Sequence, residues 1–99
     1  MEVIEVGKLL EKFIIENEDL VEKIRETNLN GDVNIINEEY EKFSKGISPK
    51  NVTFLWIYLC SSEERLNKFG ILSGETCKGF KARYVACEIL KSIGEYTFV

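Results

Sequence analysis

The 99-residue chain contains no histidine, no glutamine, one proline and one methionine. Histidine is the usual base near neutral pH and a common metal ligand, so its absence removes the ordinary forms of acid–base catalysis and of a zinc site. The phosphate-binding pattern Gly-x-x-x-x-Gly-Lys is also missing. The sequence therefore predicts a protein that is not an enzyme and that has no catalytic residue, no metal site and no cofactor.

No apolar run approaches the roughly 20 residues that a membrane-spanning helix needs. The longest, Val52 to Cys60, has nine residues with Thr53 among them. The opening MEVIEVGKLLEKF has neither a basic start nor a cleavage site of small residues, so we expect an intracellular protein without a signal peptide. Its length, with 44% hydrophobic and 30% charged residues, predicts a single domain over residues 1–99.

The cysteines Cys60, Cys77 and Cys87 show no Cys-x-x-Cys spacing, which favours buried thiols over a metal site. If Cys77 and Cys87 share one helix, their Cα atoms lie about 15 Å apart, beyond the roughly 7 Å reach of a disulfide. Whether Cys60 pairs with either one depends on the fold. Cys77 has two lysines nearby in sequence, but we interpret it as a packing thiol rather than a nucleophile.

In the first half, apolar residues spaced by three and four predict one helix from Val3 to Thr27, although the polar cluster at Asn17 could instead start a second helix. Residues 33–36 are too few to decide on and are interpreted as an extended connector. Asn37 is predicted to cap a short helix that ends at Gly46.

In the second half, Ser48 and Pro49 form a favourable helix start. The next segment, VTFLWIYLC, also suits a strand, after which Ser61 could cap a new helix. An apolar stripe that continues to Phe69 favours one helix over residues 49–69. A last helix is expected from Ser73 to Ile93.

The predicted fold is mainly α, a compact four-helix arrangement with a central apolar helix over residues 49–69 and a short extended C-terminal tail. The alternative is an α+β fold with short strands at 33–36, 52–60 and 96–99.

The segment 52–60 is apolar on every side when it is drawn as a helix, and such a helix must be surrounded. Either it is the centre of the monomer core, or one of its sides lies at a subunit interface. For the second interpretation the contact residues would be Phe54, Trp56 and Tyr58, since large aromatic residues are enriched at interfaces. Because three short helices barely enclose it, we predict a symmetric homodimer.

Charge is divided unevenly along the chain. Residues 1–44 carry 12 acids and 5 bases, and residues 45–99 carry 5 acids and 8 bases, so the net charges are −7 and +3. The basic residues of the second half lie on two predicted helices with a short connection, in outline a helix-turn-helix. A nucleic-acid surface would use Arg65, Lys68, Lys78, Lys81 and Arg83. A pI near 4.9 makes this the second choice.

The segments MEVIEVGKLLEKFIIENEDL and SPKNVTFLWIYLC, with the overall length, make the chain similar to small proteins of filamentous DNA viruses of thermoacidophilic archaea, of the lipothrixvirus or rudivirus type. The resemblance implies a viral protein of the host cytoplasm that is very stable to heat and acid. It transfers no functional residue.

The leading functional hypothesis is a non-enzymatic, self-associating interaction protein or accessory protein. The first alternative is a small DNA-binding regulator. The second is an enzyme that takes carboxylates from separate helices.

Overall fold

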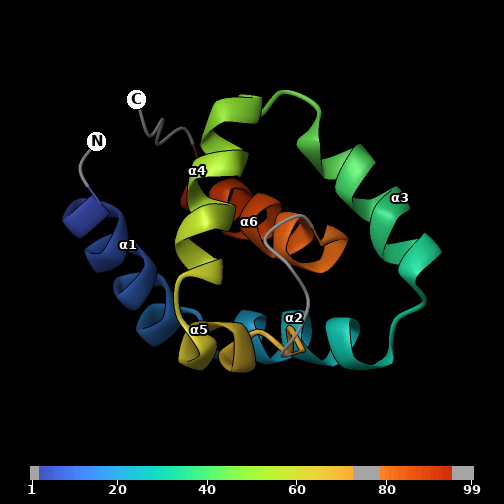
Figure 1. The fold of residues 1–99 in the computed structure, drawn as a ribbon, viewed down its shortest axis with the longest axis horizontal. Coiled ribbons are helices and arrows are strands. Elements are labelled where there is room, and N and C mark those ends of the chain that lie inside the picture. The colour runs from blue at the N-terminus through green and yellow to red at the C-terminus, as the bar shows by residue number, and fades with distance from the viewer. Residues whose placement is uncertain (1–2, 73–78, 95–99) are drawn as a thin grey trace.

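The computed structural model describes residues 3–72 and 79–94, and the chain in these ranges is mainly helical (Figure 1). The helices are α1 (Val3–Glu16), α2 (Glu18–Asn30), α3 (Val33–Ser44), α4 (Pro49–Cys60), α5 (Glu63–Lys68) and α6 (Phe80–Ile93). No strand occurs within these ranges, so the α+β alternative is wrong for 33–36 and for 52–60. The proposed strand or tail at 96–99 lies outside the described residues.

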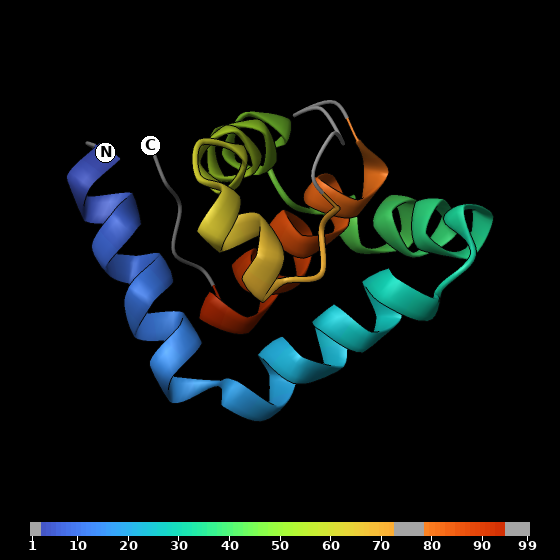
Figure 2. The ribbon, with the colours of Figure 1, turned by 60° about the horizontal axis from the view of Figure 1, so that its bottom comes forward.

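The helix at the centre of the fold is α6, not the predicted helix over residues 49–69. It packs against α3 and α4 on either side and more lightly against α2 (Figure 1). Ala82 and Ala86 are fully buried on α6, and their small side chains allow neighbouring helices to approach closely. Figure 2 shows α1 and α2 as the two arms of a V that opens toward α6.

The V has its vertex at Asn17, where the predicted continuous helix from Val3 to Thr27 is interrupted. Asn17 has φ −129° and ψ 44°, outside the helical region. Its side-chain amide and its main-chain N–H both donate to the carbonyl of Phe13, at 3.1 and 2.9 Å. A short polar side chain that bonds to the local backbone competes with the helix. The alternative of a second helix starting here is correct.

The helix α3 begins five residues earlier than predicted, at Val33. Asp32 is its N-cap, and the Asp32 carboxylate accepts a hydrogen bond from the N–H of Asn34 at 2.7 Å. The expectations of an extended connector at 33–36 and of a cap at Asn37 are therefore wrong. The apolar residues Val33 and Ile35 are more than half exposed, so they do not belong to the buried face of α3. The spacing of apolar residues at 33–36 therefore did not indicate a helix.

The segment 52–60 is helical, as predicted, but the helix does not continue to Phe69. The chain leaves the helix at Ser61, and the Ser62 hydroxyl accepts a hydrogen bond from the N–H of Arg65 at 3.5 Å to start α5. The Ser61 hydroxyl donates to the carbonyl of Tyr58 at 2.6 Å. Two adjacent serines thus satisfy the backbone at the end of one helix and the start of the next.

The last helix begins after Gly79, which is extended (φ −68°, ψ 142°), so a continuous helix from Ser73 is also wrong. Residues 73–78 lie outside the described residues. The helix ends as predicted before Gly94, whose φ is +80°.

One hydrophobic cluster joins all six helices. The predicted apolar stripes supply most of it, including Leu10, Leu55, Leu59, Val85 and Ile89, each at most 2% exposed. No helix in the described ranges is both long enough and apolar enough to cross a bilayer.

The observed caps predict which substitutions will weaken the fold. We expect Asp32→Ala to lower the free energy of unfolding by about 1 kcal/mol, because it removes the bond to Asn34 at the start of α3. Ser48→Ala is the matched control, since Ser48 makes no side-chain capping bond to α4. Urea denaturation of both variants measures the difference. A loss at Ser48 as large as the loss at Asp32 would contradict this assignment.

Candidate functional site

The aromatic residues predicted for an interface and the arginines predicted for nucleic acid lie against each other. The guanidinium of Arg65 lies 4.0 Å from the ring centroid of Tyr58, and that of Arg83 lies 4.5 Å from the ring of Trp56. Such cation–π contacts stabilise partly desolvated pairs by about 0.5–2 kcal/mol. Arg65 and Arg83 therefore pack on aromatic side chains of α4 and stabilise the contacts of this helix with α5 and α6.

Arg65 is also the most extensively hydrogen-bonded of these side chains. It donates to the hydroxyl of Tyr58 at 2.8 Å, to the Tyr58 carbonyl at 3.2 Å and to the hydroxyl of Ser61 at 2.8 Å. Beyond Tyr58 lies Gly7 of α1, where an added Cβ would meet the Tyr58 hydroxyl. Tyr58 thus links α4, α5 and α1.

The remaining predicted positions are scattered. Phe54 is half-buried on α4, Lys68 is exposed at the end of α5, and Lys81 is half-buried on α6. Lys78 and Cys77 lie outside the described residues. The structure therefore brings Arg65 and Arg83 onto the rings of α4 rather than onto one basic face with Lys68.

The buried-thiol interpretation is confirmed for Cys87, which has no exposed surface. Burial raises the pKa of the Cys87 thiol to about 11, against the lowering effect of nearby Lys91. A thiol with this pKa is almost fully protonated near neutral pH, so Cys87 is a poor nucleophile.

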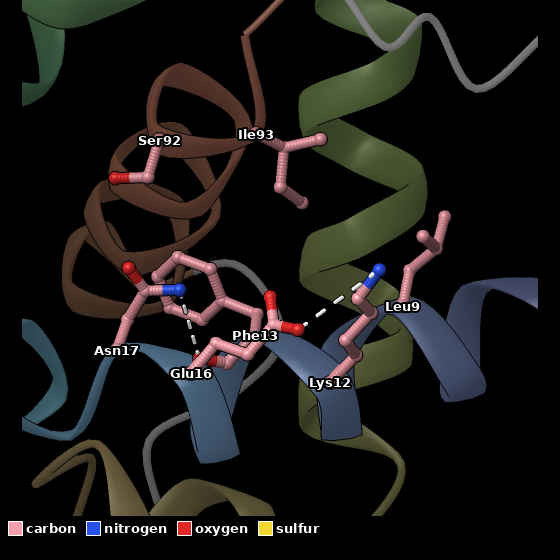
Figure 3. Close-up of a pocket in the computed structure, with 7 residues that line it drawn as sticks. All are labelled: Leu9, Lys12, Phe13, Glu16, Asn17, Ser92 and Ile93. Carbon is pink, nitrogen blue, oxygen red and sulfur yellow. Dashed lines mark hydrogen bonds and ion pairs between the residues drawn. The ribbon is translucent and has the colours of Figure 1, made fainter.

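Two pockets lie beside α6. The first lies between α1 and the C-terminal part of α6, and has a volume of about 320 Å³. Its lining consists of Leu9, Lys12, Phe13, Glu16, Asn17, Ser92 and Ile93 (Figure 3). The charged groups at its edge pair with each other, since Lys12 Nζ lies 4.0 Å from Glu16 Oε1. The Asn17 side-chain amide donates to the carbonyl of Phe13, so three of the polar side chains in the lining already have partners within the chain.

The second pocket, of about 310 Å³, lies between α2 and α3 and reaches α6. Leu20, Ile24, Ile35 and Phe43 give it apolar walls, and Lys23, Thr27, Glu39, Tyr84 and Glu88 give it polar groups. It forms because α6 packs closely against α3 but only lightly against α2. We call it the α2–α3 pocket.

Two residues that line the α2–α3 pocket, Tyr84 and Glu88, have raised pKa values. Burial, with smaller contributions from the charges of Glu88 and Glu39, raises the pKa of Tyr84 to about 12. Burial also raises the pKa of Glu88; nearby Lys91 and Lys23 oppose this effect, and Glu39 adds to it. Perturbed groups that converge in a cleft are a physical mark of a binding or catalytic site.

Sequence reasoning did not find this site. Glu39, Tyr84 and Glu88 belong to helices far apart in the chain, and no local spacing connects α3 with α6. The only available signal was general, namely that carboxylates from separate helices can meet in the fold. Among the described residues, no group of three or more acids, cysteines or histidines is arranged to hold a metal ion.

Comparison of the chain with protein-family models, with curated proteins and with solved structures finds no match.

The raised pKa of Glu88 predicts a pH dependence of stability. Between its ordinary pKa of 4.5 and the raised value, the folded protein keeps a proton that the unfolded chain loses. The stabilising effect of this protonated form is complete below about pH 4.5 and is lost as the pH rises through the raised pKa. Glu88→Gln copies the neutral form, so we expect it to be more stable than the wild type at pH 7 and equal to it near pH 4.

Urea denaturation at several pH values measures this effect, with Glu41→Gln, an exposed acid of α3, as the control. A Glu88→Gln variant that is less stable than the wild type at pH 7 would show that the carboxylate is stabilised rather than desolvated.

The contact of Gly7 with Tyr58 predicts an inverted effect of alanine. In a free helix interior, Gly→Ala stabilises by about 1 kcal/mol. Here the new Cβ would meet the Tyr58 hydroxyl, which Arg65 holds in place, so we expect Gly7→Ala to lower the melting temperature. In the Tyr58→Phe background, Gly7→Ala should lower the melting temperature less than it does in the wild type. A stabilised Gly7→Ala single variant would refute the close approach.

Proposed function

We propose that this protein is a non-enzymatic interaction protein that associates with a second copy of itself through the outer face of α4. The observation that carries the proposal is the exposure of Ile57, which is 53% exposed on the helix with the most apolar sequence. Thr53 and Phe54 lie four and three residues before it, so the three side chains share one face.

The other sides of α4 are covered within the chain. Val52, Leu55 and Leu59 are buried in the core, and Trp56 and Tyr58 have arginines over their rings. The surface around Ile57 is therefore the apolar part of α4 that the chain itself leaves exposed. This refines the predicted interface, because it puts Phe54 with Ile57 at the centre of the contact and leaves Trp56 and Tyr58 at its edges.

Charge also favours the contact of two copies of α4. The helix carries a single charged residue, Lys50, near its N-terminus, and no acid. In an antiparallel pair of such helices, the two lysines lie at opposite ends and the apolar sectors meet in the middle. A contact of this kind is isologous, as in most homodimers.

The role of a viral accessory protein, which the sequence resemblance implies, belongs to the same proposal. An interaction protein without a catalytic centre fits that role. The genes that neighbour the coding sequence test this part, since a virion operon supports it and a metabolic operon opposes it.

Self-association is tested by sedimentation velocity at tens of micromolar protein. We expect the wild type to sediment as a dimer and Ile57→Glu as a monomer, because a charge at the centre of the contact would be buried without a partner. Ile15→Glu is the matched control, since Ile15 is 74% exposed on α1 and lies outside the proposed contact. A monomeric wild type, or an equal effect of both substitutions, would overturn the proposal.

A further inference from the structure

Asn30 and Gly31 lie where α2 joins α3, and they form the one Asn-Gly pair among the seven asparagines of the chain. Asparagine is thermolabile because the next main-chain nitrogen can attack its side-chain amide. Glycine favours this attack, since it has no Cβ to keep the nitrogen at a distance. Asn30 is exposed to water as the last residue of α2. The groups that react in a deamidation are therefore adjacent at this corner of the fold.

The folded structure holds the attacking nitrogen away from the reaction. The Gly31 N–H donates to the carbonyl of Thr27 at 2.7 Å, at the C-cap of α2. To attack Asn30, this nitrogen must lose its proton and leave the Thr27 carbonyl. The reaction therefore requires the last turn of α2 to open, and helix ends are the parts of a fold that open most easily.

Close packing around Gly31 gives a second, independent reason why the corner must open. A Cβ added to Gly31 would meet the carbonyl oxygen of Thr27 and would lie 3.2 Å from the side chain of Ile36, which is fully buried. The cyclic imide that forms in deamidation places a carbon on the Gly31 nitrogen where its hydrogen now points at Thr27. The closed corner has no room for that carbon.

We infer that Asn30 is a site of spontaneous deamidation that reacts only when the corner between α2 and α3 opens, and that the isoaspartate formed there prevents the corner from closing again.

The reaction needs only water. The Gly31 nitrogen forms a bond to Cγ of Asn30, the Cγ–Nδ2 bond breaks, and Nδ2 leaves as ammonia with the proton of the Gly31 nitrogen. Water then opens the imide. Breaking the bond between Cγ and nitrogen gives aspartate at position 30, whereas breaking the bond between the main-chain carbonyl and nitrogen gives isoaspartate, in which the chain continues through the side chain.

The two products have different effects on the corner. Both add a negative charge at the C-terminus of α2, where the helix dipole disfavours it. Aspartate leaves the main chain unchanged, so Gly31 can return to Thr27. Isoaspartate lengthens the main chain by one carbon before Gly31, so the bond to Thr27 and the close approach to Ile36 cannot both form again. The inference does not depend on self-association through α4.

The first experiment compares the folded full-length chain with the same chain unfolded in urea, both at mildly alkaline pH, with peptide mapping to follow Asn30. We expect the folded chain to react between about fivefold and a hundredfold more slowly, because opening a helix end costs far less than global unfolding. Isoaspartate should form in both.

Several results would overturn the inference. Equal rates would show that the corner gives no protection, and a slowing of more than a hundredfold would show that only global unfolding exposes the site. An unfolded chain that stays intact at Asn30 would remove the site altogether. Aspartate without isoaspartate would exclude the route through the Gly31 nitrogen.

The second experiment separates local opening from general loss of stability. Asp32→Ala removes the capping bond next to the corner, so we expect Asn30 in the folded chain to react about threefold to fivefold faster, with no change in urea. Gly7→Ala is the matched control, because it perturbs α1, the other arm of the V (Figure 2), and should leave the rate unchanged. Equal acceleration by both variants, or none by Asp32→Ala, would contradict the local route.

The third experiment tests the effect of the product. The deamidated fraction is separated by its additional negative charge and is compared with Asn30→Asp, which has the same charge and an ordinary main chain. We expect the deamidated fraction to melt at a lower temperature and to lose the hydrogen-exchange protection of the Gly31 amide. Identical melting and exchange would show that isoaspartate does not hold the corner open.

Discussion

The need to cover α6 on nearly every side determines the arrangement of the other helices. Seven of its 14 residues are buried, and the alanines at 82 and 86 allow the neighbouring helices to come close. Straight helices of 25 and 21 residues could not wrap around so short a centre. The interruptions at Asn17 and at Ser61–Ser62 therefore give four short helices, and their side-chain hydrogen bonds satisfy the backbone where each turn occurs.

The second consequence concerns α4, which is apolar around its whole circumference but has too few neighbours to cover it. Arginine side chains take the place of a missing helix on two of its flanks, because a guanidinium can lie flat on a ring while its edge stays in contact with water. Arg65 and Arg83, two of the five basic residues predicted for a nucleic-acid surface, are thus part of the packing. The sector around Ile57 remains exposed.

The third consequence is the α2–α3 pocket. Because α2 is one arm of the V and touches α6 only lightly, a gap opens toward α3, and the polar side chains of α6 reach it. Burial in this pocket is the largest cause of the raised pKa values of Glu88 and of Tyr84. A fold that depended on packing alone would be more stable with neutral groups at these positions.

Local sequence signals predicted that the described part of the chain is helical, where α4 begins and α6 ends, and which faces enter the core, since Pro49, Gly94 and the apolar stripes act through local geometry. It could not place the interruptions, because Asn17 and the paired serines permit a helix to continue as readily as to stop. The folded structure places Arg65 and Arg83 over aromatic rings and brings Glu39 and Glu88 into the lining of one pocket. Both depend on contacts between distant segments, which exist only after α6 has been enclosed.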